Sequence, residues 1–364
     1  MAPFTPMNKQ QKIAAFDPSK PGLADESIFG LPFTGDESDI IIIPVPWEVT
    51  VSYGAGASDG PEAILEASFQ VDLHHQEFPE LWKLGIYLDL NEQTVAWAKK
   101  SVTYKALARP IIEALESGEV IEKLPSLQND LDKINIVCRE LNDEIKARTL
   151  YWLQRGKKVA LLGGDHSTPL GYYEALGTIH DAFGMLHLDA HMDLRIAYEG
   201  FTYSHASIMY NALKLPQVSK IVQVGIRDFC KEEFEIAQDP RVIVHTDSDM
   251  KAAAFEGLTW KQQCEQIIDE LPQKVLISFD IDGLYSWYCP GTGTPVPGGF
   301  SYEQAAYLLS KLGESGKEII GFDLVEVAPG DSDWDGNVGA RMLFHLCGVF
   351  AKNNGLDTGK RLAF

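Results

Sequence analysis

Three short motifs rich in aspartate and histidine follow apolar stretches of the chain, and their side chains are typical ligands of divalent cations. In extended chain every second side chain projects to the same side. Asp189, His191 and Asp193 are therefore predicted to converge on one point, and Asp280 and Asp282 likewise share a face. The motifs are Gly163-Gly164-Asp165-His166-Ser167, Asp189-Ala190-His191-Met192-Asp193 and Ser278-Phe279-Asp280-Ile281-Asp282.

Brought together, the motifs would crowd four aspartates around two histidines, His166 and His191. Four neighbouring carboxylates repel one another and acquire raised pKa values unless cations lie between them. A pair of divalent ions satisfies that charge requirement. Oxygen and imidazole donors without a thiolate suit Mn²⁺ better than structural zinc, with Ni²⁺ as an alternative. Two adjacent ions can share a water molecule and lower its pKa, which predicts hydrolytic chemistry.

Each motif taken alone has a simpler interpretation as a surface turn, because Gly, Asp and Ser are common turn residues. All three occur in order after apolar stretches, which surface turns do not explain. In the first motif the two glycines are predicted to let the chain turn sharply and to place His166 at the end of a strand.

The elements that must position these motifs are short apolar runs separated by amphipathic stretches. Runs of this kind are typical of buried parallel strands, and ligands gather beyond the carboxyl ends of such strands. The alternation predicts an α/β fold with a parallel sheet covered by helices on both faces. The runs lie at 40–43, 159–162, 185–188, 221–224, 242–244, 275–277 and 319–322, and helical patterns lie at 131–154, 260–271, 302–312 and 338–351.

One domain is predicted from residue 39 to residue 364, because no repeat or low-complexity linker divides the chain. Residues 1–38 are expected to form an arm over the surface. Residues 91–129 have mixed character and no clear strand, so we expect irregular structure there, as an insertion or a lid-like excursion.

With these motifs in view, the sequence resembles the ureohydrolase family of arginases and agmatinases, and most closely its agmatinase-like members. The match runs from about residue 39 to 350. It includes Gly54-Ala55-Gly56, Gly60-Pro61 and Gly291-Thr292-Gly293-Thr294-Pro295. The resemblance implies a three-layer α/β/α fold with a mostly parallel sheet and a dinuclear manganese centre. It implies that one metal is held by His166, Asp189, Asp193 and Asp280, and the other by Asp189, His191, Asp280 and Asp282.

The resemblance also assigns roles beside the metals. His205 would pass a proton to the leaving amine, a task that suits imidazole near neutral pH. Glu326 would grip the guanidinium group, whose shape matches a carboxylate. Asp282 would help the metals to stabilise the tetrahedral intermediate. Taken singly, His205 could be a solvent-facing residue at a helix start, and Glu326 a solvated strand end.

The expected substrate is a small cationic guanidino compound, and agmatine, split into putrescine and urea, is the first choice. Arginases carry an Asn after the second motif and Ser and Asn before the histidine, whereas this chain has Arg195 and no Asn before His205. Arg195 is interpreted as part of an ion pair at the rim of the site, or else as a partner for a substrate carboxylate. Guanidine, arginine, other guanidino acids and formimino compounds are the alternatives.

A second departure follows the third motif, where relatives have an Asp-Pro pair. Here the chain reads Gly283-Leu284-Tyr285-Ser286-Trp287-Tyr288-Cys289-Pro290. The aromatic residues of 285–289 either reshape the pocket, around guanidine or around an aliphatic stem, or pack within their own loop. Cys289 is expected to be a packing residue.

Composition excludes several classes of protein. A net charge of -21 argues against nucleic acid and anionic membranes as partners, because both require basic patches. Five scattered cysteines without a CxxC pair, no signal-like segment and no apolar run of membrane-spanning length predict a cytoplasmic protein. Family resemblance implies a homo-oligomer, a trimer or hexamer. The rival interpretations are a non-catalytic, metal-bearing sensor of cationic amines and a Rossmann-type nucleotide protein, although no GxGxxG supports the latter.

Overall fold

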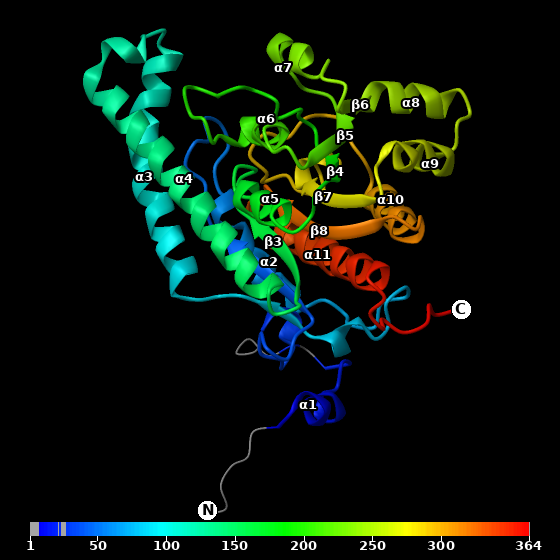
Figure 1. Ribbon diagram of the computed structural model, residues 1–364. Helices are drawn as coiled ribbons and strands as arrows, with labels where there is room; N and C mark the ends of the chain where they lie inside the picture. Colours follow the sequence, from blue (N-terminus) through cyan, green and yellow to red (C-terminus); the bar gives the residue numbers. More distant parts are fainter. Residues whose placement is uncertain (1–6, 21, 23–26, 364) are drawn as a thin grey trace, which may run out of the picture.

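A computed structural model describes residues 7–20, 22 and 27–363 and has a single eight-stranded sheet at its centre (Figure 1). Its strand order is β2-β1-β3-β8-β7-β4-β5-β6, and every pairing between neighbouring strands is parallel. The strands are β1 (Ile40–Val45), β2 (Ile86–Leu88), β3 (Lys158–Gly163), β4 (Phe183–Leu188), β5 (Val218–Ile226), β6 (Val242–Thr246), β7 (Lys274–Asp280) and β8 (Glu318–Val325).

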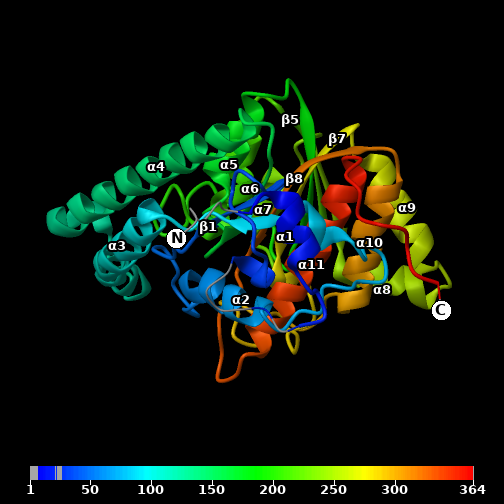
Figure 2. The same ribbon diagram turned by 90° about the horizontal axis from the view of Figure 1, so that it is seen from below.

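Helices cover both faces of the sheet, which confirms the predicted three-layer α/β/α fold (Figures 1 and 2). One face packs against α2 (Gly60–Ser68), α9 (Trp260–Glu270), α10 (Tyr302–Glu314) and α11 (Trp334–Asn353). The other packs against α3 (Glu92–Glu116), α4 (Pro125–Leu153), α5 (Leu170–Gly177) and α6 (Ile208–Leu213). The remaining helices are α1 (Lys9–Ala15), α7 (Lys231–Ile236), α8 (Asp247–Phe255) and the short 3-10 turns Ile28–Gly30, Ala57–Asp59, Leu81–Leu84, Ile121–Lys123, His205–Ser207 and Ile281–Gly283.

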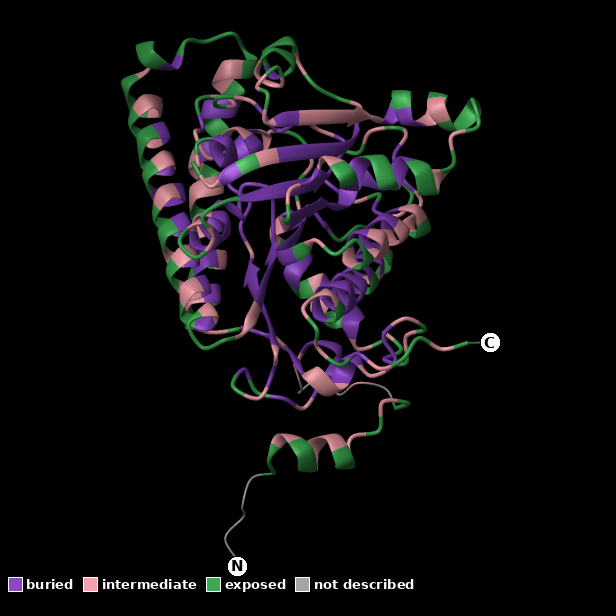
Figure 3. Cartoon of the chain, turned by 45° about the vertical axis from the view of Figure 1, so that its right-hand side comes forward, coloured by how far each residue is buried: buried purple, intermediate pink, exposed green. Residues whose placement is uncertain are grey.

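The two faces are built from alternate residues of each strand. In β1, Ile40 and Ile42 point into the core under α2 and α11, whereas Ile41 and Ile43 point into the core under α3 and α4. Because both faces are buried, the strands read as unbroken apolar runs rather than as alternating patterns. The buried sheet and the largely exposed outer helix surfaces are visible in Figure 3.

All seven apolar runs singled out in the sequence are strands, each extended by one to a few residues. The strand β2 was not predicted, because Ile86-Tyr87-Leu88 is too short a run to stand out from its surroundings. It forms the edge of the sheet, where it pairs with β1.

The prediction of irregular structure at 91–129 is wrong, because most of this stretch is the long helix α3. Asn91 caps the helix by accepting hydrogen bonds from the backbone of Gln93 and Thr94. The buried face of α3 includes Thr94 and Ser101 beside Trp97. Polar residues on that face hid the helical periodicity, and the helix α4 follows after a short turn.

The described residues before residue 39 are only partly a surface arm. The helix α1 has no buried residue, but Phe29 is buried and meets Phe344 of α11 edge to face, with 5.0 Å between ring centroids. This segment therefore also contributes to the core. Within the described residues, no helix is long and apolar enough to cross a membrane.

Candidate metal centre

The predicted ligand motifs meet at the carboxyl ends of central strands. The strands β3, β8, β7 and β4 are consecutive in the sheet, and all of them run in the same direction. His166 follows β3, Asp189 follows β4, and Asp280 ends β7. The residue after β8 is Glu326. Chain segments more than a hundred residues apart in the sequence therefore place their side chains together at the carboxyl ends of these strands.

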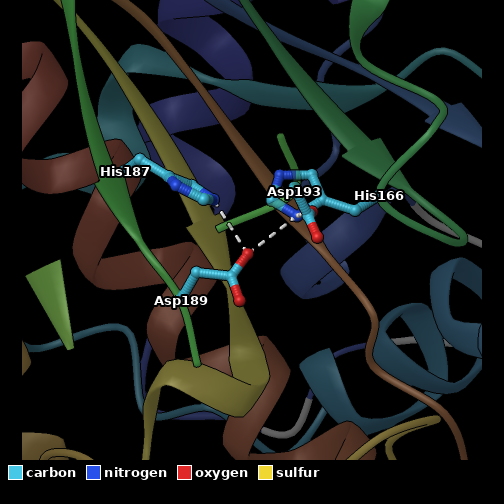
Figure 4. A group of neighbouring side chains, drawn as sticks. All are labelled: His166, His187, Asp189 and Asp193. Atoms are coloured by element: carbon cyan, nitrogen blue, oxygen red, sulfur yellow. Dashed lines mark hydrogen bonds and ion pairs between the residues drawn. The ribbon is translucent and has the colours of Figure 1, made fainter. Parts of the chain in front are cut away.

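The first group of ligand atoms surrounds the ring of His166 (Figure 4). Its Nδ1 lies 3.1 Å from a carboxylate oxygen of Asp189, 3.1 Å from Asp193 and 3.2 Å from Asp280. This Nδ1 is buried and has no hydrogen-bond partner among the described residues. A ring nitrogen aimed at three carboxylates is the arrangement that a cation between them would satisfy.

The second group contains Asp189, His191 and Asp282. Nδ1 of His191 lies 3.0 Å from an oxygen of Asp282 and 3.5 Å from Asp189. The other oxygen of Asp282 accepts a hydrogen bond from the backbone of Ala190, which fixes its orientation. Asp189 belongs to both groups, as a bridging ligand should, whereas Asp280 lies beside His166 and accepts from the backbone of Asp282.

His187 is a member of the first group that sequence reasoning missed. Its Nε2 lies 2.8 Å from Asp189, and Figure 4 shows the two side chains facing each other. His187 stands two residues before Asp189, on the same face of the strand, and that spacing was the available signal. The residue was hidden because it lies inside an otherwise apolar run. Gln223 of β5 holds it from the other side, with Nε2 3.0 Å from Nδ1 of the ring.

The aspartates of this cluster have pKa values that are shifted in different directions. Burial would raise the pKa of Asp189, but the charge of His187 and the adjacent rings of His166 and His191 hold the pKa well below its ordinary value. Burial and the negative charges of its neighbours raise the pKa of Asp280 well above the ordinary range, and burial and Asp189 raise the pKa of Asp193 to about 6. Divalent cations would remove this conflict by favouring all the carboxylates in ionised form. The donor set therefore fits a metal pair.

One backbone expectation for the motifs was wrong. Asp193 has φ of 53°, so the second motif is not extended throughout, and its last carboxylate reaches His166 from a left-handed conformation. The chain bends at Gly164 after β3, although neither Gly163 nor Gly164 has positive φ. Gly164 is required for another reason, because a Cβ there would lie 2.1 Å from the carbonyl oxygen of Trp47.

A buried network holds the ring of His166 from behind. Its Nε2 lies 2.9 Å from Oγ of Ser278, which in turn donates to Asp323 at 3.0 Å. The hydroxyl of Tyr173 donates to the second oxygen of Asp323 at 3.0 Å. With Nε2 engaged, Nδ1 is the ring atom left to meet a metal, which is the usual outer-shell arrangement around metal-binding histidines.

A cavity of about 190 Å³ opens over the two groups. His205 lies on its wall, near His191 and Asp193. Burial and the positive charges of His191 and His166 lower the pKa of His205 to about 3, so its imidazole is neutral at neutral pH. The cavity is lined by Ser52, Tyr53, His191, Asp193, Arg195, Tyr198, His205, Ala206, Asp228, Phe229, Glu233 and Thr294.

Arg195 is engaged in an ion pair at the cavity wall. Its Nε lies 3.7 Å from the carboxylate of Glu233, and its guanidinium lies 4.7 Å from the ring centre of Tyr198. Glu233 is buried and also accepts hydrogen bonds from the backbone of Leu194 and Cys230. These contacts favour the ion-pair interpretation of Arg195 over a free partner for a substrate carboxylate.

Glu326 lies beside the first motif rather than on the cavity wall. It is buried, has φ of 64°, and accepts a hydrogen bond from the backbone of His166 at 2.8 Å. Burial and the charge of Asp165 raise the pKa of Glu326 well above its ordinary value. A nearby cation would lower that pKa and favour the carboxylate form.

The loop 285–289 packs on itself and does not line the cavity. The rings of Tyr285 and Trp287 stack with 4.3 Å between centroids, and Lys251 lies over Tyr285. The carbonyl of Trp287 accepts a hydrogen bond from Trp334, and Cys289 is buried, as expected. Of the two alternatives for this loop, the structure favours loop packing.

Comparison with known proteins identifies the family. The arginase family model matches residues 38–348. The N(1)-aminopropylagmatine ureohydrolase of Thermus thermophilus is 30% identical over 328 residues, which cover 89% of this chain and 93% of the relative. The agmatinase of Halalkalibacterium halodurans is 28% identical over 295 residues, 81% of this chain and 85% of the relative. The crystal structure of the agmatine ureohydrolase of Thermoplasma volcanium shares the fold with a TM-score of 0.67 at 23% identity, covering 90% of this chain and 95% of that one.

The chain therefore belongs to the arginase family, and it is a metal-dependent hydrolase of the ureohydrolase class. This confirms the resemblance seen in the sequence. The roles of single residues in the site stay predictions.

Proposed function

We propose that the protein hydrolyses a small cationic guanidino compound to urea and an amine, with agmatine as the expected substrate. The observation that carries the proposal is the cavity lined by Asp193 of the first His/Asp group, by His191 of the second, and by His205 and Asp228. The named relatives act on agmatine or aminopropylagmatine, which agrees with this choice.

In the proposed centre, His166, Asp189, Asp193 and Asp280 hold one metal, and Asp189, His191, Asp280 and Asp282 hold the other. Manganese is the proposed metal because the donors are oxygen and imidazole atoms. When bound, such a pair supplies a nucleophile from water near neutral pH and electrostatic stabilisation of the developing charge.

Three residues of the site have further proposed roles in the reaction. Glu326, whose carboxylate lies next to His166 rather than on the cavity wall, would attract and orient a guanidinium that reaches the metal groups. His205 begins as a neutral imidazole, because its pKa is lowered to about 3. In the metal-bound centre it would carry a proton to the leaving amine. Asp282, which lies 3.0 Å from the ring of His191, would help the metals to stabilise the tetrahedral intermediate.

The distal end of the substrate is proposed to be an ammonium rather than an amino acid group. Asp228 is exposed on the cavity wall, and no hydrogen bond or ion pair of its side chain occurs within the described residues. Arg195, the cation that would attract an α-carboxylate, is already paired with Glu233. The negative charge of Asp228, unpaired among the described residues, and the paired positive charge of Arg195 favour agmatine over arginine.

The first test measures urea release from agmatine, arginine, guanidine and a guanidino acid by protein loaded with Mn²⁺, and then with Ni²⁺. We expect agmatine to be hydrolysed fastest, and Asp189→Asn to lower the rate by more than about 100-fold, since both groups lose a ligand. Asp269→Asn, an exposed aspartate on α9, is the matched control and should leave the rate unchanged.

Retained turnover in the Asp189→Asn variant would contradict the proposed centre. Urea released from guanidine alone would support the proposed reaction but would show that guanidine, not agmatine, is the substrate. Agmatine binding in calorimetry without urea from any compound would instead support the non-catalytic sensor.

The proposal also includes a homo-oligomer, a trimer or hexamer, and a cytoplasmic location. Both rest on family resemblance and on the sequence. Light scattering of the purified full chain tests the first, and microscopy of the tagged protein in its own cells tests the second.

A further inference from the structure

The long helices α3 and α4 form a hairpin over residues 92–153 that lies along one side of the sheet and extends past its end (Figure 1). The apolar residues of the hairpin, such as Trp97 and Ile134, are buried because the hairpin covers the sheet. It does not explain a set of polar contacts that the hairpin makes with two loops lining the cavity. We call these the 49–58 loop and the 198–201 turn.

The helix α3 holds the 49–58 loop through Glu48. The side chain of Glu48 is fully buried, and one oxygen accepts hydrogen bonds from the backbone of Gly56 at 2.7 Å and Ser58 at 3.1 Å. The other oxygen pairs with Lys105 of α3. The backbone of Glu48 also donates to Oγ of Ser101 on the same helix, at 2.9 Å. Lys105 therefore supplies the charge that a buried carboxylate requires.

The helix α4 holds the 198–201 turn through one side chain. Nδ2 of Asn135 donates to the carbonyl of Gly200 at 3.2 Å, and its Oδ1 accepts from the backbone of Thr202 at 2.8 Å. Contact is close here, because a Cβ on Gly200 would lie 2.8 Å from the side chain of Leu131. Asn135 on α4 thus forms hydrogen bonds with two backbone groups in and next to the 198–201 turn.

The two held segments meet above the metal groups. Ser52, in the 49–58 loop, lies 3.5 Å from the hydroxyl of Tyr198, in the 198–201 turn. Both residues line the cavity, as does Tyr53. The ring of Tyr198 lies edge to face with His205, with 6.0 Å between centroids. The position of the turn therefore affects the proposed proton carrier and the part of the cavity wall that Tyr198 forms.

We propose that the α3–α4 hairpin sets the shape of the substrate cavity, with Lys105 and Asn135 as positioning residues for its two walls. Neither residue lies on the cavity wall or among the metal groups. Their loss should therefore weaken substrate binding while leaving the metal centre intact. The kinetic part of this inference rests on the proposed function, but the structural part does not.

The test compares Asn135→Ala and Lys105→Met with the wild-type full chain. Hydrogen exchange followed by mass spectrometry should show faster exchange over 198–204 in Asn135→Ala and over 49–58 in Lys105→Met, with strand β5 unchanged. Matched controls are Glu140→Ala on α4 and Lys99→Met on α3, both exposed. Bound manganese should stay equal in all variants.

With the substrate found in the urea assay, both variants should raise KM by about tenfold and change kcat by less than about twofold, because substrate positioning before the reaction is lost. Asn135→Asp, which keeps the acceptor for the backbone of Thr202, should raise KM less than Asn135→Ala does. Exchange in the two loops equal to that of the controls overturns the inference. Faster exchange in a protein that releases no urea supports it and refutes the proposed function instead.

Discussion

At the scale of single residues, buried histidines in this protein differ in charge because their neighbours differ. His166 lies among carboxylates, which outweigh burial and raise its pKa well above the ordinary value. His345 in α11 is also buried, but burial and the neighbouring His75 lower its pKa to about 4. Its Nε2 lies 3.1 Å from the carbonyl of Ala306, and the neutral ring packs edge to face against Phe78.

This lowered pKa predicts acid sensitivity from a residue far from the metal groups. An unfolded chain protonates His345 near pH 6.5 and the folded chain only near pH 4, so stability present above pH 6.5 is lost as pH falls toward 4. Between pH 7 and 4.5 the wild type should lose about 2 kcal/mol more unfolding free energy than His345→Gln. Urea unfolding at both pH values measures this, and an equal loss in the two proteins would contradict it.

At the scale of elements, backbone strain gathers in the segments that form the candidate site. Four described residues other than glycine have positive φ: Phe29, Asp193, Glu199 and Glu326. Two of these carry proposed site carboxylates, and Glu199 lies in the 198–201 turn. Tyr198 and Phe201 exchange hydrogen bonds across that turn, with φ of 54° at Glu199 and 81° at Gly200. Strained conformations of this kind are typical of functional segments.

The turn yields a stability prediction. Glu199→Gly should raise the unfolding free energy by about 1 kcal/mol, because glycine adopts positive φ without steric cost. The change also removes a buried carboxylate oxygen that has no hydrogen-bond partner among the described residues. Glu256→Gly, at an exposed position with φ of -83°, is the control and should be slightly destabilising. Urea unfolding compares the two, and destabilisation by both would show that the turn is not strained.

At the scale of the whole molecule, the metal groups connect central strands that are distant in sequence. Ligands follow β3, β4 and β7, and repulsion among their carboxylates opposes folding when no cation is bound. The net charge of -21 adds to this repulsion. Metal binding should therefore stabilise the entire domain rather than one loop.

Removal of metal should accordingly lower the Tm. Manganese at about 100 times its Kd should stabilise the fold by about 2.7 kcal/mol over protein treated with a chelator. Differential scanning calorimetry measures the shift, and Asp189→Asn serves as the comparison, since it should respond far less. A wild-type Tm that is the same with and without manganese would show that the cluster does not bind this metal in the folded chain.

The sequence by itself determined the fold class, the family and the ligand types. Strands buried on both faces must be continuous apolar runs, and parallel strands must end at a common edge, so motifs following such runs could be expected to meet. This reasoning placed His166, Asp189 and Asp280 together although they are far apart along the chain. Local information was sufficient because each motif directly follows its own strand.

Only the tertiary structure decided the features that depend on contacts between distant segments. His187 belongs to the ligand cluster because it faces Asp189 in the folded sheet, and Asp193 reaches His166 through a left-handed backbone that no local pattern indicates. The aromatic loop at 285–289 lies outside the cavity because it stacks on itself. Asn135 meets Thr202 across 67 residues of chain, and such a pairing has no periodicity or motif in the sequence. Its energy comes from hydrogen bonds that exist only once both segments are folded.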